Sequence, residues 1–168
     1  MDKKIVSACF AGLHCRYDGK HNRVEEIVEL IRSGEAIPVC PEQLGGLKTP
    51  RPPAEIVGGD GDDVLDGKAR VVDNRGNDVT EQFLRGAREA LALAKAVGAK
   101  HAILKEKSPS CGSCAIYDGT FSGRKKPGAG VTAALFRRHG IRVESEENFS
   151  KKAPPCETGG RAGRDSGE

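Results

Sequence analysis

The sequence predicts a single α/β domain, a three-layer sandwich around a mostly parallel, Rossmann-like sheet. Short apolar runs typical of buried strands alternate with amphipathic helical segments, and this order favours a parallel sheet. The chain has 168 residues, the size of one ordinary domain. A long stretch rich in glycine and proline, residues 45–53, is expected to run over the surface beside the sheet. We expect the domain to cover residues 1–149 and residues 150–168 to form a disordered, polar tail.

The first strand–helix–strand unit is predicted within residues 4–39. Residues 4–8 form an apolar run that is too short for a helix. Residues 24–33 carry apolar side chains at helical spacing, and Gly34 ends that helix. Residues 36–39 form the second strand, which Pro41 ends because proline has no backbone donor. A right-handed parallel crossover follows from this order.

The second half of the chain continues the alternation. Residues 55–73 resemble short strands or a hairpin-like excursion, and a long helix capped by Asp78 or Thr80 extends to Ala96. A third parallel strand is expected at residues 101–104, a glycine-rich loop at residues 120–130, a helix at residues 131–139 and a last strand at residues 141–144. The predicted buried face of the long helix contains Phe83, Ala87, Leu91 and Ala94.

Composition excludes several function classes. Hydrophobic residues make up 37% and charged residues 30% of the chain, and no apolar run reaches the length of a membrane span. The N-terminus lacks the apolar core of a signal peptide, so a cytoplasmic location is expected. The net charge of +3 gives no case for a nucleic-acid partner, and aromatic residues at 4% do not favour base stacking. The oligomeric state cannot be read from the sequence.

Cysteines are the most informative residues. In a cytoplasmic chain, six cysteines indicate metal binding or catalysis better than structural disulfides. Cys9, Cys40 and Cys111 each lie at or shortly after the end of a predicted parallel strand, beside a glycine or proline turn. The carboxyl ends of parallel strands meet at one edge of a sheet, so these thiols are predicted to share one soft metal centre. Cys15 lies in the same loop as Cys9, as a possible fourth ligand or an auxiliary thiol.

The remaining two cysteines are weaker candidates. Cys114 follows Cys111 with a two-residue gap and is either a ligand or an inward-pointing strand residue. Cys156 lies in the expected tail and is predicted to have no structural role. Three thiolates on a four-iron cluster would leave one iron without a protein ligand, which favours catalysis. Four closed thiolates would instead indicate a zinc-stabilised, non-catalytic binding module, and a persulfide on Cys111 or Cys114 is a third hypothesis.

Three other side chains are candidate catalytic residues. Glu42 follows Cys40 by two residues and is a candidate general base. Ser108 and Ser110 precede Cys111 and are candidate proton or hydrogen-bond donors, although turn serines often only cap backbone amides. The charged loop residues near them, such as Arg16 and Arg51, are expected to be solvated by default.

Three long motifs resemble a known family. They are VSACFAGLHCRYDGK at residues 6–20, PVCPEQLGGLKTPRPPAE at residues 38–55 and KEKSPSCGS at residues 105–113. They are similar to those of a small bacterial family, long catalogued as a domain of unknown function, that includes the thiouracil desulfidases. The resemblance extends from about residue 3 to residue 148.

The resemblance implies a [4Fe-4S] cluster and a set of site residues. Its ligands would be Cys9, Cys40 and Cys111, with Cys15 as a possible alternative or auxiliary thiol. Glu42 would activate water, and Ser108 or Ser110 would be the catalytic serine. Cys114 departs from the family pattern and leaves a possible alternative ligand.

The implied function is iron–sulfur-dependent desulfidation of a small-molecule thiocarbonyl. Sulfur would be removed from a compound such as 2-thiouracil, which gives uracil and hydrogen sulfide by a non-redox hydrolytic route. The alternative from a different class is the zinc-stabilised binding module.

Overall fold

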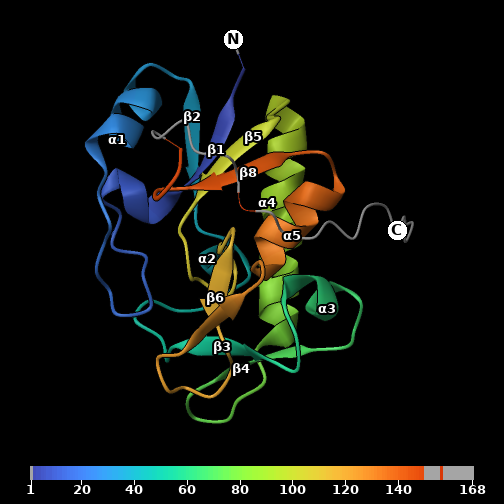
Figure 1. The fold of residues 1–168 in the computed structure, drawn as a ribbon. Helices are drawn as coiled ribbons and strands as arrows, with labels where there is room; N and C mark the ends of the chain where they lie inside the picture. The colour runs from blue at the N-terminus through green and yellow to red at the C-terminus, as the bar shows by residue number, and fades with distance from the viewer. Residues whose placement is uncertain (1, 150–155, 157–168) are drawn as a thin grey trace.

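A four-stranded parallel sheet forms the centre of the molecule (Figure 1). The computed structural model describes residues 2–149 and Cys156, so the expected tail lies outside the described residues apart from that cysteine. The strand order is β2-β1-β5-β8, and each neighbouring pair is parallel. The strands are β1 (Lys4–Ser7), β2 (Ala36–Val39), β5 (His101–Leu104) and β8 (Arg142–Ser145). The predicted α/β class with a mostly parallel sheet is confirmed.

Helices cover both faces of this sheet and make the three predicted layers. Alternate strand residues point to opposite faces. Val6 and Ile103 pack in the cluster under α1 (Glu25–Arg32) and the short 3₁₀ helix η1 (Ala8–Ala11). Ile5 and Leu104 pack in the cluster under α4 (Thr80–Val97) and α5 (Val131–Arg138). The predicted inner face of the long helix is confirmed, because its four named residues are all buried.

Two small antiparallel sheets lie below the carboxyl edge of the central sheet (Figure 1). One pairs β3 (Ala54–Val57) with β4 (Arg70–Asp73), which is the hairpin-like excursion predicted from the sequence. The other pairs β6 (Ala115–Tyr117) with β7 (Lys125–Pro127), a strand within the segment that was expected to be a loop. A separate apolar cluster joins both small sheets to α4 and α5. The small sheets thus pack on the same helices as the main sheet.

Helix α3 (Gly61–Leu65) was not predicted. Asp60 and Asp63 form a capping box, in which each carboxylate accepts the other residue's backbone N–H at 3.0–3.1 Å. A hairpin-like excursion was expected over residues 55–73, and an Asp-Gly pair is typical of the turn in such a hairpin. Reciprocal capping satisfies two exposed amides and outweighs that preference.

Helix α2 (Pro41–Leu44) positions the segment that follows β2. Pro41 ends the strand, as predicted, and also occupies the first helical position, where its missing N–H costs nothing. Glycines permit a close contact between α2 and α4. A Cβ on Gly86 would lie 1.8 Å from the Pro41 carbonyl oxygen, and one on Gly45 would lie 2.0 Å from that of Gln82. This contact fixes the position of α2 relative to the central sheet.

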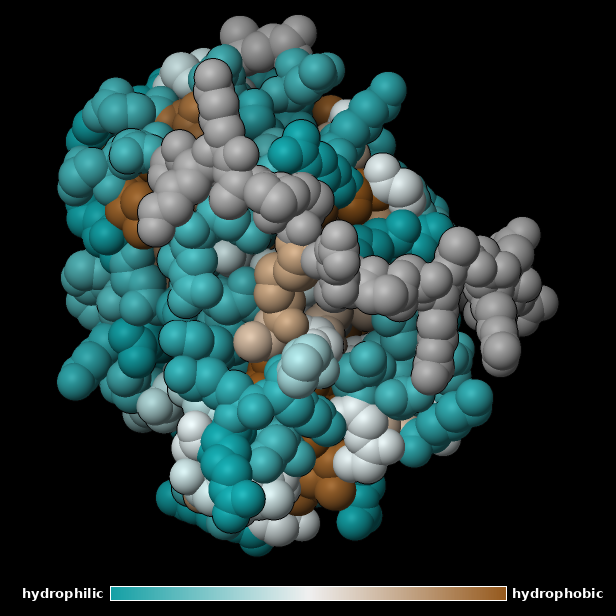
Figure 2. Space-filling model, in the orientation of Figure 1, coloured by the Kyte–Doolittle hydropathy of each residue, from teal (hydrophilic) through white to brown (hydrophobic). Residues whose placement is uncertain are grey.

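The visible face is mainly hydrophilic, with apolar residues in small patches (Figure 2). The large hydrophobic residues exposed among those described are Leu13, Tyr17, Leu44 and Phe121. None of the described helices is long and apolar enough to span a bilayer.

Candidate active site

A cavity of about 720 Å³ lies at the carboxyl edge of the central sheet. The ends of β1, β2 and β5 contribute one wall, and the glycine- and proline-rich loop contributes another. Residues of β3, β4 and the loop before β7 complete it. The exposed aromatic residues Tyr17 and Phe121 also line it. The cavity has the position that ligand sites occupy in open parallel sheets.

Four thiols line this cavity. Cys9, Cys15, Cys40 and Cys111 are all free, and three of them are buried while Cys40 is half-buried. Cys9 lies in η1 directly after β1, Cys40 directly follows β2, and Cys111 lies in the loop after β5. The structure therefore brings together the three thiols predicted from the strand ends, and Cys15 as well.

The Cys15 side chain interacts with two of the other thiols, those of Cys9 and Cys40. Its thiol hydrogen bonds to both of these side chains. The hydrogen bond from Cys15 lowers the pKa of Cys9 and, in the same way, lowers the pKa of Cys40 to about 7. The pKa of Cys15 itself is raised, because Cys15 is the group that keeps its proton. The lowered pKa values of Cys9 and Cys40 favour the thiolate, which is the form that binds metals.

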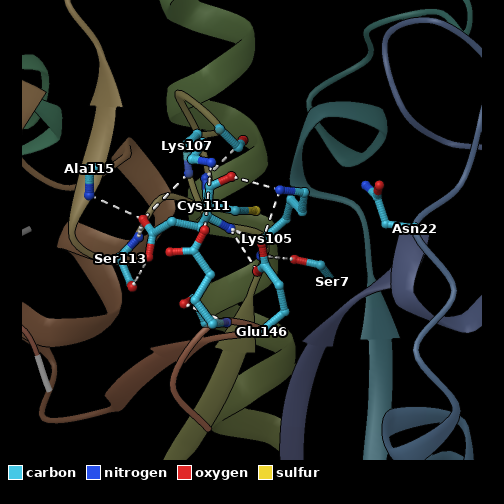
Figure 3. Close-up of polar contacts among 12 residues, drawn as sticks. Ser7, Asn22, Lys105, Lys107, Cys111, Ser113, Ala115 and Glu146 are labelled. Carbon is cyan, nitrogen blue, oxygen red and sulfur yellow. Dashed lines mark hydrogen bonds and ion pairs between the residues drawn. The ribbon is translucent and has the colours of Figure 1, made fainter. Parts of the chain in front are cut away.

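Cys111 is in the most apolar environment of the four. Burial raises the pKa of its thiol, which is only partly offset by a hydrogen bond with the Ser7 side chain. Ser7 is held in turn by the Lys105 backbone N–H, which donates to its Oγ at 2.9 Å (Figure 3). The Lys105 ammonium lies 3.0 Å from the Glu146 carboxylate, so the end of β8 holds the segment that leads to Cys111 (Figure 3).

Four free thiols on one cavity are a donor set that suits a soft metal centre such as an iron–sulfur cluster. No group of three or more His, Cys, Asp or Glu side chains converges on one ion anywhere in residues 2–149 or at Cys156. Cluster thiolates bind separate irons and can stand further apart. The donor set, soft sulfur only, is the one that iron–sulfur clusters take.

Glu42 and Ser108 form a hydrogen-bonded pair on the cavity wall. Ser108 Oγ donates to Glu42 Oε1 at 3.3 Å. The same Oγ accepts the backbone N–H groups of Ser110 and Cys111, each at 3.1 Å. Because these two donors occupy the oxygen's lone pairs, the hydroxyl proton points to the carboxylate. The hydroxyl thus orients the carboxylate, which can act as a general base toward the cavity.

Ser110, the other candidate serine, lies elsewhere. Its side chain is buried, and its Oγ shares a 2.8 Å hydrogen bond with Thr132 Oγ1 at the start of α5. It does not line the cavity. Of the two candidate serines, only Ser108 is placed to contact a substrate.

Arg51 was expected to be solvated, but its side chain is only 7% exposed. It forms an ion pair with Glu42 on the cavity wall. The flanking prolines, Pro50 and Pro52, were the available signal, since they stiffen a loop and make a fixed side chain more plausible. Arg16 also lines the cavity and pairs with Asp18 at 3.0 Å, and it remains part-exposed.

The segment around Cys111 is held by a buried carboxylate that the sequence analysis missed. Glu106 accepts the backbone N–H groups of Ser113, Cys114 and Ala115 at 2.8–3.1 Å, and the Ser113 hydroxyl at 2.7 Å (Figure 3). Burial alone would raise the pKa of Glu106, but these hydrogen bonds outweigh it and the pKa is lowered. The ionised carboxylate therefore fixes the loop that carries Cys111.

The structure contradicts the expectations for Cys114 and Cys156. They form a disulfide, although the cysteines were expected to be reduced and Cys156 to have no structural role. Cys114 therefore has no free thiolate to offer as an alternative ligand, and it does not line the cavity. The pairing was not visible in the sequence, because the two residues lie 42 positions apart and one lies beyond the predicted domain.

Comparisons with known proteins point to one group. Residues 5–148 match the family described as 2-thiouracil desulfurase. An uncharacterized protein, YbbK, of Bacillus subtilis is 53% identical over 146 residues, which cover 87% of this chain and 97% of that protein. A solved structure of a [4Fe-4S]-dependent thiouracil desulfidase, TudS, is 47% identical with a TM-score of 0.79. The match covers 89% of this chain and 94% of that chain.

Proposed function

Because the chain belongs to the 2-thiouracil desulfurase family, we propose that it hydrolyses a small thiocarbonyl compound such as 2-thiouracil. The products would be uracil and hydrogen sulfide, and the cofactor a [4Fe-4S] cluster. Family membership and an enzyme of this type were both predicted from the sequence and are confirmed. The observation that carries the proposal is the single cavity shared by four free thiols and the Glu42–Ser108 pair.

Cys9, Cys40 and Cys111 would hold the cluster. Cys9 and Cys40 directly follow β1 and β2, and Cys111 lies in the loop after β5 that Glu106 holds in place. When bound with three thiolates, the cluster supplies one iron without a protein ligand, a Lewis acid for the thiocarbonyl sulfur. Cys15 would remain a thiol that hydrogen bonds to the sulfurs of Cys9 and Cys40.

Glu42 would be the general base, and Ser108 would be its hydrogen-bond donor. Glu42 takes a proton from the attacking water, and the Ser108 hydroxyl, which donates to Oε1, keeps the carboxylate oriented for this transfer. Water adds to the thiocarbonyl carbon, the carbon–sulfur bond breaks, and two protons leave with sulfur as hydrogen sulfide. The carbon keeps its oxidation state, so the reaction needs neither an oxidant nor a reductant.

Substitution of these two residues tests the proposal. In Glu42→Gln and Ser108→Ala, turnover of 2-thiouracil should fall by roughly 10²–10⁴, the usual contribution of general acid–base catalysis. Iron and sulfide content after anaerobic reconstitution should stay at the wild-type level. Ser110→Ala is the matched control, because its hydroxyl bonds to Thr132 outside the cavity, and it should retain turnover.

Two outcomes would contradict the proposal. Full activity of Glu42→Gln would show that Glu42 is not the base. A colourless protein with stoichiometric zinc, and no cluster after reconstitution, would favour the zinc-stabilised binding module.

A further inference from the structure

We propose that Arg51 is a positioning residue that holds Glu42 with one carboxylate oxygen facing Ser108. The inference rests on the proposed function and adds a residue to it. Arg51 does not touch the reacting atoms in this assignment, and it acts through Glu42.

The contacts divide the two oxygens of Glu42 between two partners. Arg51 Nε donates to Glu42 Oε2 at 2.9 Å, and Arg51 Nη2 donates to the same oxygen. Oε1 is left to accept the Ser108 hydroxyl. A carboxylate clamped through one oxygen cannot rotate freely, so the other oxygen keeps its direction. The base and its proton partner are therefore aligned before a substrate enters.

Arg51 can act in this way because its own position is fixed. Its Nη2 also donates to the Cys15 carbonyl oxygen at 2.9 Å, and its Nη1 donates to Thr49 Oγ1 at 3.1 Å. Thr49 Oγ1 accepts a further hydrogen bond from Gln43 Nε2, on the same short helix as Glu42, at 2.9 Å. The guanidinium thus joins the loop of Cys15, the proline-rich loop and α2.

The shape of the side chain matters as well as its charge. Arginine offers several N–H donors in a planar fork, whereas a lysine ammonium is a compact point charge on a flexible stem. A lysine could neutralise Glu42 but could not contact the carboxylate, the Cys15 carbonyl and Thr49 in one fixed geometry. Arg51→Lys should therefore lose most of the positioning while it keeps the charge.

Kinetics of Arg51 variants test the inference. In Arg51→Ala, kcat for 2-thiouracil should fall by about 100-fold, the cost of a misplaced catalytic group. KM should change much less, and cluster iron should stay at the wild-type level. Added guanidinium ion, which refills the vacated site, should restore turnover in a saturable way, and sodium chloride at equal ionic strength should not. Arg51→Lys should lose most of the same kcat, because the charge alone does not restore the alignment.

Arg138 provides the matched control. It is also a partly buried arginine, 21% exposed, and it donates to the Asp62 and Asp66 carboxylates and to a backbone carbonyl, far from the cavity. Arg138→Ala should keep kcat and show no guanidinium response. Loss of iron in Arg51→Ala, an unchanged kcat, or a loss that guanidinium does not reverse would overturn the assignment.

A second measurement separates failure of this inference from failure of the proposed function. If the wild-type protein with a full cluster converts no thiocarbonyl compound, the proposed function fails. The crystal structure of Arg51→Ala then decides the inference by itself. Rotation of Glu42 away from Ser108 would support it, and an unchanged Glu42–Ser108 contact would overturn it.

Discussion

At the scale of single residues, the protonation of Cys15 would determine whether the proposed cluster has three or four thiolate ligands. Cys15 hydrogen bonds to both Cys9 and Cys40, and its carbonyl oxygen is held by Arg51. A fourth thiolate would close the cluster, whereas a retained thiol would leave one iron open and support the two ligand sulfurs.

Replacement of Cys15 by serine distinguishes these roles. Serine keeps a hydroxyl donor but is a poor ligand for iron compared with a thiolate. Cys15→Ser should retain cluster iron and sulfide near the wild-type level, whereas Cys9→Ser should lose both. The measurement is iron and acid-labile sulfide per chain after anaerobic reconstitution. Equal loss in the two variants would make Cys15 a ligand.

The residues of the site differ in how far the sequence could predict them. Cys9, Cys40 and Cys111 could be placed together because each lies at or shortly after the end of a strand. The choice between Ser108 and Ser110 could not be made, because it depends on Thr132, which enters from a distant helix. Arg51 was missed for the same reason, since its burial depends on contacts with segments that are separate in sequence.

At the scale of elements, the contact between α2 and α4 sets the position of Cys40 and Glu42. Gly86 lies inside α4, where an alanine would normally stabilise the helix by about 1 kcal/mol. Here a Cβ would lie 1.8 Å from the Pro41 carbonyl oxygen, which belongs to backbone and cannot turn aside. The glycine is therefore required by packing.

Gly86→Ala should destabilise the protein in spite of its better helix propensity. Overpacking of this kind costs about 1–3 kcal/mol, and displacement of α2 should also lower turnover and iron content. Glu89→Ala is the control, because it is exposed on the same helix and should keep or raise the melting temperature. Thermal unfolding of both variants gives the comparison. A Gly86→Ala variant as stable and active as wild type would contradict the packing argument.

Helices and strands were predicted accurately where the apolar pattern of the sequence is strong. The prediction failed where a few capping or pairing contacts determine whether a short element forms. The third strand was predicted at the residues where β5 forms, and the long helix within a few residues of α4. Helix α3 is only five residues long and depends on one pair of aspartates, so no apolar period reveals it. Strand β7 consists of Lys125–Pro127 and is defined by pairing with β6, which a sequence of basic residues does not indicate.

At the scale of the whole molecule, the Cys114–Cys156 disulfide ties a residue beyond the predicted domain to the loop that carries Cys111. The Cys114 backbone N–H donates to Glu106 at 2.9 Å, and Arg137 Nη1 donates to the neighbouring Ser113 carbonyl at 2.7 Å. The Glu106 contacts hold the loop without Cys156, whereas Arg137 also donates to the Cys156 sulfur at 3.8 Å. The disulfide is therefore expected to contribute to stability more than to the geometry of the cavity.

The Cys156→Ser variant tests whether the disulfide contributes to stability rather than to the geometry of the cavity. The bond closes a segment with a sequence separation of 42, and by chain-entropy arguments its loss lowers the free energy of unfolding by at most about 4 kcal/mol. The denaturation midpoint of the variant should be lower than that of the wild-type protein. Reductant should lower the midpoint of the wild-type protein and should leave that of the variant unchanged. Turnover should stay near the wild-type level, because Glu106 still holds the loop.

In metal-free, denatured wild-type protein, four thiols should react before reduction and six after it. Six reactive thiols before reduction would show that the bond does not form, and a loss of turnover in Cys156→Ser would show that the cavity depends on it.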